Sequence, residues 1–141
     1  RNTEVIPYPY SVKDGKVWLE KSLKERRKKW PGQFDFAVEV DGKVAGAISL
    51  VQIQHGHKAE IGYWLGKDYR GKKIISQAIK EICRFGFNDL KLKRITAKVF
   101  SFNPASKRVL EKNGFELEGT LKKEAKKGNK YLDAYLMARV K

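Results

Sequence analysis

The chain has few of the residues that mark secreted and membrane proteins. It has one cysteine, Cys83, so no disulfide can form within the chain, and we expect a reducing, cytoplasmic setting. No apolar run approaches the roughly 20 residues that a membrane-spanning helix needs, and we expect neither a secretory signal nor a membrane partner. With 141 residues, of which 41% are hydrophobic, the sequence predicts a single globular domain over residues 1–141.

Acidic residues are also scarce. The 16 Asp and Glu residues oppose 31 Lys and Arg residues, which gives a net charge of +15. The imbalance lies mostly after Gly66, where 20 basic residues accompany 8 acidic ones, against 11 and 8 up to that point. Such a field attracts anionic partners, which include phosphorylated cofactors, nucleic acid and acidic proteins. A solvated, lysine-rich surface would have the same composition, so the charge alone does not identify an anionic partner.

Hydrophobic periodicity and turn residues predict the order of elements. The first is a helix from Ser11 to about Lys29, with Ser11 or Asp14 as its cap and Trp30-Pro31-Gly32 as its stop. Three antiparallel strands, a helix, a strand, a second helix and a hairpin follow. Their ranges are 34–40, 43–54 and 59–65 for the strands, 75–88 for the helix, 94–100 for the next strand, 104–113 for the second helix, and 115–124 with 131–140 for the hairpin.

The strand–helix–strand step from Ile61 to Phe100 requires parallel neighbours joined by a right-handed crossover. The other strands are expected to pair antiparallel. A basic loop follows the first parallel strand and leads into the helix, so backbone N–H groups and positive charge meet at the helix N-terminus. Arg70, Lys72 and Lys73 lie in this loop. The segment therefore predicts a site for a phosphorylated ligand.

Three motifs then identify a resemblance that covers the chain from Pro7 onward. They are residues Ala59–Leu65, Tyr69–Ile75 and Asn103–Phe115. Together they resemble the GNAT superfamily of N-acetyltransferases, and within it the Rim-type branch that acetylates ribosomal-protein alanine. The resemblance implies an α/β (α+β) fold: a mixed, mostly antiparallel twisted sheet with one central parallel strand pair splayed around the cofactor, flanked by helices. The family fold opens with one more strand and helix, so we expect the sequence to be incomplete at its N-terminus.

The resemblance also implies acetyl-CoA as cosubstrate and places its binding residues. The pantetheine arm would pair with the backbone edge of Tyr63, Trp64 and Leu65, as an added strand does. The pyrophosphate would lie on the N–H groups of the basic loop and helix start. Two positions where the family has glycine or alanine hold Lys73 and Ile75, which puts the cofactor affinity at risk. The pyrophosphate set is Arg70, Gly71, Lys72, Lys73, Ile74 and Ile75.

Direct attack by an amine needs two proton transfers. Glu60 is the candidate base because it lies on the strand that lines the site, although a surface carboxylate beside a lysine is the alternative. Ser106 is the candidate acid for the leaving thiolate, or simply a helix hydroxyl. Asn103 is expected to cap its helix and to contact the cofactor arm. His55 and His57 flank one glycine without a third ligand, so we expect no metal.

We therefore expect an N-acetyltransferase whose acceptor is a protein N-terminal amine, ribosomal in type. A small-molecule amine such as a polyamine, an amino acid or an antibiotic is the first alternative. The second alternative is a degenerate domain that performs no chemistry and binds a partner protein or nucleic acid.

Overall fold

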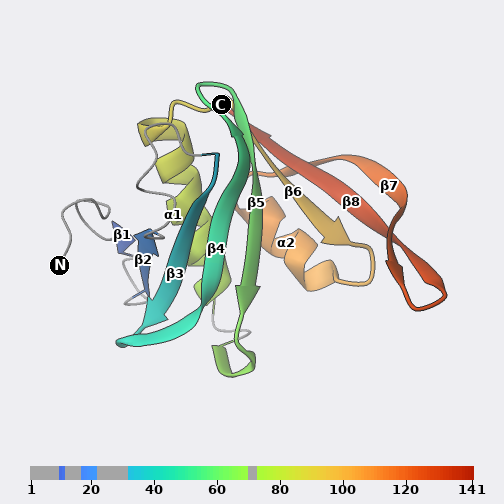
Figure 1. Cartoon of the computed structure of the whole chain (residues 1–141), viewed down its shortest axis with the longest axis horizontal. Coiled ribbons are helices and arrows are strands. Elements are labelled where there is room, and N and C mark those ends of the chain that lie inside the picture. The colour runs from blue at the N-terminus through green and yellow to red at the C-terminus, as the bar shows by residue number, and fades with distance from the viewer. Residues whose placement is uncertain (1–9, 12–16, 22–31, 70–72) are drawn as a thin grey trace.

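The computed structural model describes residues 10–11, 17–21, 32–69 and 73–141 (Figure 1). Over this part the chain forms five strands, then an α-helix, a sixth strand, a second α-helix and a final pair of strands. The strands are β1 (Tyr10–Ser11), β2 (Val17–Lys21), β3 (Phe34–Val40), β4 (Lys43–Gln54), β5 (Lys58–Leu65), β6 (Arg94–Phe100), β7 (Glu116–Lys127) and β8 (Lys130–Val140). The helices are η2 (Lys67–Tyr69, 3-10), α1 (Ile74–Arg84), η3 (Phe85–Asp89, π) and α2 (Pro104–Lys112).

The eight described strands form one sheet in the order β1-β2-β3-β4-β5-β6-β8-β7. Strands β5 and β6 pair parallel, and every other described pair is antiparallel. The mixed sheet with one central parallel pair is therefore confirmed. The predicted turns are confirmed as well, since Asp41 and Gly42 both have positive φ, as a two-residue hairpin turn of type I′ requires.

The predicted helix from Ser11 to Lys29 is wrong where the structure describes it. Residues Tyr10–Ser11 and Val17–Lys21 form strands, and β2 pairs antiparallel with β3 from Val17↔Val40 to Lys21↔Phe36. The charged residues of this stretch have good helix propensity, but pairing with the free edge of β3 overrides so weak a local preference. The rest of the predicted helix, apart from these strands, lies outside the described residues.

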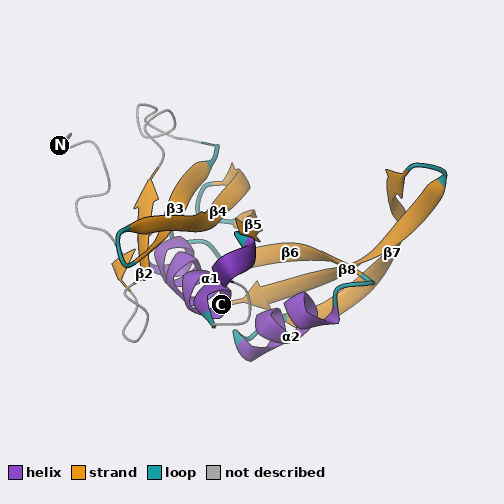
Figure 2. Cartoon of the chain, turned by 90° about the horizontal axis from the view of Figure 1, so that it is seen from below, coloured by secondary structure: helices purple, strands orange, loops and turns teal. Residues whose placement is uncertain are grey.

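Both α-helices cover the same face of the sheet, which Figure 2 shows from below. Helix α1 packs its apolar stripe on the sheet, because its buried side chains recur at helical spacing. Its hydrogen-bonding pattern then widens into the π-helix, where Phe85 meets Phe34 and Phe36 edge to face at 5.1 and 5.3 Å. The buried residues of α1 are Ile74, Ala78, Ile79, Glu81, Ile82 and Cys83.

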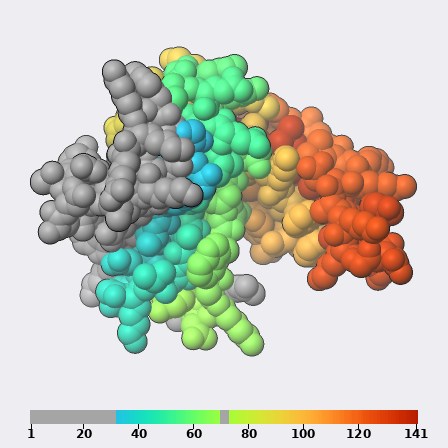
Figure 3. Space-filling model, in the orientation of Figure 1, coloured from blue at the N-terminus to red at the C-terminus, as the bar shows by residue number. Residues whose placement is uncertain are grey.

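The C-terminal hairpin enters the sheet through its second strand. β8 pairs with β6 from Arg94↔Val140 to Phe100↔Ala134, and β7 then forms the edge. The tip of the hairpin projects away from the rest of the described surface (Figure 3). None of the helices in the described part is both long enough and apolar enough to span a bilayer.

Candidate active site

The parallel strands β5 and β6 are paired over only half of their length. Their ladder runs from Lys58↔Arg94 to Ile61↔Ala97 and stops there. β5 continues to Leu65 with β4 as its neighbouring strand, while β6 continues to Phe100 with β8. The two strands diverge beyond this point (Figure 1). From Gly62 to Leu65, β5 has β4 on one side and no strand partner on the other side in the described sheet. This is the splayed arrangement that the resemblance predicts.

A glycine keeps the far end of β5 close to β4. A Cβ on Gly46 would lie 2.2 Å from the carbonyl oxygen of Trp64, a distance that no side chain tolerates. The contact continues beyond the strand, where the Gly66 N–H donates to the Ala45 carbonyl at 2.7 Å. Strand β5 therefore follows β4 rather than β6, and the divergence is built into the sequence at this glycine.

Tyr63 and Ser106 meet beside the divergence. Tyr63 lies on β5 beyond the last pair with β6, and its hydroxyl is hydrogen-bonded to Ser106 Oγ, with either oxygen able to donate. Both side chains are half-buried. Burial raises the pKa of the Tyr63 phenol above its usual value of 10.0, and the hydrogen bond to Ser106 offsets part of that rise. The phenol is thus protonated at neutral pH and can donate.

Helix α2 presents Ser106 in its first turn. Asn103 is its N-cap, and the Asn103 side-chain oxygen accepts from the Ser106 N–H at 3.2 Å. Pro104 follows at the first helical position, where its missing N–H costs nothing. The predicted cap is confirmed, and the helix ends before Gly114, which has φ 88°. The cap fixes Ser106 at the β6 end of the divergence.

Glu60 lies on the opposite face of the sheet from Ser106. Side chains alternate along β5, so Glu60, Gly62 and Trp64 point away from the helices while Tyr63 points toward them. Glu60 is half-buried and pairs in register with Thr96 of β6. The Glu60 carboxylate also helps to raise the pKa of Lys98, after the larger effect of the hydrogen bond from Lys98 to Glu124. The two predicted catalytic side chains therefore approach the splayed strands from opposite sides.

The start of α1 offers backbone donors. Lys73 is its N-cap, with φ 62° in the left-handed region, and it makes no side-chain cap hydrogen bond. This conformation explains why the related motif favours glycine there, since a side chain costs energy at positive φ. Ile74 is buried and Ile75 packs partly against the core. The other predicted phosphate-binding residues, Arg70, Gly71 and Lys72, lie outside the described residues.

An aromatic rim surrounds the open face of the divergence, and the sequence reasoning did not assign it. Trp64 is 60% exposed at the end of β5, on the face of Glu60. Phe102, which is 64% exposed, stacks on Phe100 with ring centroids 5.5 Å apart. Phe100 shares the face of Glu60, because it lies four residues after Thr96 on β6. Strand alternation predicts that Trp64 shares a face with Glu60, whereas the Tyr63–Ser106 contact also depends on where α2 packs.

Other candidate residues lie apart from this site. His55 and His57 form the predicted turn between β4 and β5. Cys83 is 1% exposed, and burial raises the pKa of its thiol to about 12. In the described part of the chain, no group of three His, Cys, Asp or Glu side chains could hold a metal ion.

The arrangement fits a pantetheine-like arm and a phosphorylated head. Beyond Ile61, the side of β5 away from β4 has no strand partner in the described sheet, which suits an extended ligand. The start of α1 has no side-chain cap from Lys73, which suits a phosphate. Tyr63 and Ser106 supply protonated hydroxyls beside this path. A carboxylate lies on the other face of the same strand. Backbone groups, two hydroxyls and a carboxylate therefore lie around one divergence of the sheet.

Comparison with known proteins agrees with this geometry. The model of the acetyltransferase (GNAT) domain matches residues 1–116. The L-amino acid N-acetyltransferase AaaT of Escherichia coli is 33% identical over 143 positions, covering 99% of this chain and 83% of that protein. The ribosomal-protein-serine acetyltransferase of Escherichia coli is 37% identical over 106 residues, covering 74% and 59%. The probable N-acetyltransferase YjcK of Bacillus subtilis is 40% identical over 100 residues, covering 70% and 55%, so this chain spans little more than half of that relative.

Solved structures share the fold. The spermidine N-acetyltransferase SpeG chimera from Vibrio cholerae and hSSAT superposes with a TM-score of 0.73 at 26% identity, over 77% of this chain and 67% of that one. The ribosomal L7/L12 α-N-protein acetyltransferase RimL, solved in complex with coenzyme A, gives a TM-score of 0.72 at 27% identity, over 77% and 62%. Family model, relatives and fold agree: the chain belongs to the GNAT family of acetyltransferases.

Proposed function

We propose that this protein transfers an acetyl group from acetyl-CoA to a primary amine by direct attack. The observation that carries the proposal is the divergence of β5 and β6 after Ile61 and Ala97, with Tyr63 and Ser106 beside it. RimL in complex with coenzyme A and the MccE acetyltransferase in complex with acetyl-CoA share this fold. The backbone of Tyr63, Trp64 and Leu65 holds the pantetheine arm in this proposal.

In this proposal, the two proton transfers take place on opposite faces of the sheet. Glu60, on the open face, accepts the proton of the incoming ammonium group through water, since a protonated amine cannot attack. Ser106 and Tyr63, on the helix face, donate a hydrogen bond to the departing thiolate. Bound acetyl-CoA supplies a thioester carbonyl as the electrophile. Backbone N–H groups from Lys73 to Ile75, together with Arg70, Gly71 and Lys72, bind the pyrophosphate, and Asn103 contacts the cofactor arm.

The acceptor in this proposal is a protein N-terminal amine, as in the ribosomal-protein acetyltransferases among the relatives. The open face supports it: the exposed rings of Trp64, Phe100 and Phe102 can cover the first side chains of a peptide. Lys98 lies on the same face in an ion pair with Glu124 at 3.2 Å, and Glu60 is nearby, so the local charge does not select between a peptide and a polycation.

A small-molecule amine is the second candidate, because an amino acid acetyltransferase aligns with 99% of this chain. Spermidine acetyltransferases are also among the relatives. These acceptors differ from a peptide in length and charge, so one acceptor screen separates them.

The test has two steps. Calorimetric titration of acetyl-CoA should give binding in the micromolar range, as for ordinary enzyme substrates. Thiol release is then followed with peptides carrying ribosomal-protein N-termini, with free amino acids and with spermidine. Turnover of the peptides alone supports the protein acceptor, and turnover of a small amine alone contradicts it. Absence of heat at millimolar acetyl-CoA would overturn the enzymatic proposal and favour a binding module.

A further inference from the structure

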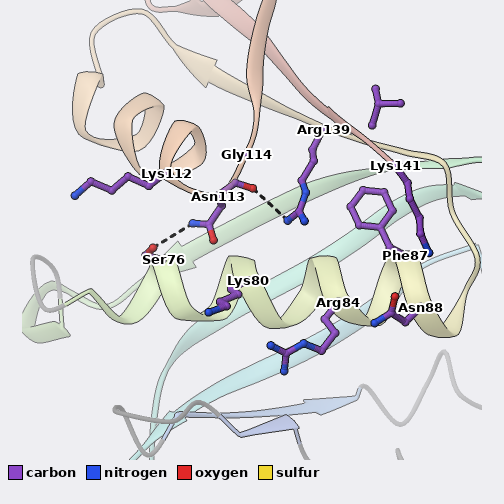
Figure 4. A pocket seen from close by; sticks show the side chains of 11 residues that line it. Ser76, Lys80, Arg84, Phe87, Asn88, Lys112, Asn113, Gly114, Arg139 and Lys141 are labelled. Atoms are coloured by element: carbon purple, nitrogen blue, oxygen red, sulfur yellow. Dashed lines mark hydrogen bonds between the residues drawn. The ribbon is translucent and has the colours of Figure 1, made fainter.

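A groove of about 710 Å³ lies between α1 and the ends of α2 and β8, and its lining residues are not among those of the candidate active site (Figure 4). One wall is α1 with the π-helix that follows it. The other wall is the end of α2 with the end of β8. We call it the α1–β8 groove. Its lining is Ser76, Lys80, Arg84, Phe87, Asn88, Lys112, Asn113, Gly114, Arg139, Val140 and Lys141.

One hydrogen bond and one contact between a cation and a ring join the two walls. The Asn113 side-chain amide, just after α2, donates to Ser76 Oγ of α1 at 3.1 Å (Figure 4). Arg139 of β8 donates to the Asn113 carbonyl at 3.2 Å, and its guanidinium carbon lies 5.2 Å from the centre of the Phe87 ring. The groove is therefore formed before any ligand arrives, and a ligand need not order its walls.

The lining is strongly basic. It holds five cationic side chains and no acidic one. The carboxylate of Glu81, which is buried, accepts from Arg84 at 3.1 Å and offsets that charge in part. Lys80 and Lys112 are exposed and form no ion pair with any other described residue. Five cations around one groove, at least two of them without an ion pair among the described residues, favour an anionic occupant with more than one charge. The five cations are Lys80, Arg84, Lys112, Arg139 and Lys141.

The groove suits carboxylates on a peptide better than nucleic acid. Single-stranded nucleic acid binds where exposed aromatic rings stack on its bases. The one aromatic residue of the lining, Phe87, is 5% exposed and lies under Arg139. The volume is that of a site for a small ligand or a short peptide, which is too small for a duplex. Arginine forks match carboxylates in geometry, and the amide of Asn88 can bond a peptide backbone.

We propose that the α1–β8 groove binds a short acidic segment of a partner protein. Lys80 and Arg84 lie four residues apart on one face of α1, about 6 Å along the helix axis, so both can contact one extended chain. Lys112 and Arg139 belong to the other wall, where Arg139 is held by a hydrogen bond to a backbone carbonyl and Lys112 extends outward (Figure 4). The groove shares no residue with the divergence of β5 and β6, although Ser76 at its end directly follows the last residue of the candidate phosphate site.

The test is fluorescence anisotropy with a labelled peptide of about ten residues in which glutamate alternates with glycine. The double variant Lys80→Gln/Lys112→Gln removes two exposed cations from the groove. The matched control, Lys127→Gln/Lys130→Gln, removes the same charge at the tip of the β7–β8 hairpin. We expect at least a tenfold weaker affinity for the groove variant and less than a threefold change for the control. Equal losses would overturn the proposal, since they would show a general field and no site.

Two further arms identify the ligand class and the site. Oligouridylate of equal charge should bind more weakly than the peptide, and tighter binding that the groove variant abolishes would assign the groove to nucleic acid instead. Saturating coenzyme A should leave peptide binding unchanged, whereas displacement would make the groove part of the cofactor site. Both variants replace exposed lysines, and unchanged urea midpoints would confirm that each is folded. The outcome does not depend on acetyl transfer.

Discussion

At the residue scale, Ser106 connects the two strands of the candidate site. Its hydroxyl contacts Tyr63 of β5, and its N–H is held by Asn103 at the end of β6. Two hydroxyls in contact share their protons, so removing either leaves the other without its partner. If they act on the leaving thiolate together, their kinetic effects will not add.

Ser106→Ala and Tyr63→Phe should therefore each lower kcat roughly 100-fold, in the range of a single acid–base group. The double variant should be little worse than either single one. Rates measured with the best acceptor, together with calorimetric affinities for acetyl-CoA, check this. Additive losses would separate the two hydroxyls, and an unchanged kcat for Ser106→Ala would remove Ser106 from the mechanism.

Lys73 is the second residue on which the site depends, because its backbone is left-handed at φ 62°. Lys73→Gly should be about 1 kcal/mol more stable to urea than Lys73→Ala, the reverse of the order inside a helix. Lysine and alanine both pay for a Cβ at positive φ, and glycine does not. Equal midpoints for the two variants would show that the turn carries no such strain.

At the element scale, Gly46 controls where β5 goes. Gly46→Ala should destabilise the protein by about 2–3 kcal/mol, because its Cβ would lie 2.2 Å from the Trp64 carbonyl and the strands must separate. Gly119→Ala on β7 is the matched control, since a Cβ there meets nothing within 4 Å. Urea unfolding measures both. Similar costs for the two variants would contradict the close approach of β4 and β5.

Local patterns were sufficient for most elements after Gly32. The alternation of Phe34–Val40 and the cap at Asn103 each depend on neighbouring residues, and both predictions are confirmed. The pairing of Val17–Lys21 with β3 is a long-range contact, so propensity predicted a helix there and was wrong. The insertion of β8 between β6 and β7 is also a choice among distant partners, which no local signal decides.

The candidate site was predicted less completely than the elements. Motif positions brought Tyr63, Ser106 and Asn103 together, because strand and helix order fix which ends meet. Predicting that the Tyr63 and Ser106 side chains touch requires both strand alternation and the arrangement of the sheet. The same holds for predicting that Glu60 lies on the other face. Roles for Glu60, for the phosphate-binding residues and for Ser106 stay predictions until they are measured.

At the scale of the whole molecule, the open face of the sheet and the helix face differ in their charged groups. Glu60 and the aromatic rim lie on the open face of the sheet. The α1–β8 groove, with its five cations, lies on the helix face. The effect of the net charge of +15 on a partner therefore depends on which face of the sheet the partner meets.

The stability of the whole fold should fall steeply in alkali because of Cys83. Burial raises the pKa of its thiol from 9.0 to about 12, with Arg139 lowering it in part. Between these values the unfolded chain loses the thiol proton while the folded protein keeps it. The folded state then binds more protons, so the free energy of unfolding decreases as the pH rises. One group contributes a slope of up to about 1.4 kcal/mol per pH unit over this window.

Cys83→Ala lacks this group and should lose less stability between pH 9 and 11 than the parent protein, although its cavity makes it less stable at pH 7. Urea midpoints measured across this range with reductant present compare the two slopes. Tyr63 also has a raised pKa, but it titrates in both proteins and cancels from the difference. Parallel curves would mean that the thiolate forms in the native state, and Cys83 would then react with thiol reagents without unfolding. A shallower curve for the variant would instead show that the thiol on the buried face of α1 stays protonated because the fold excludes water from it.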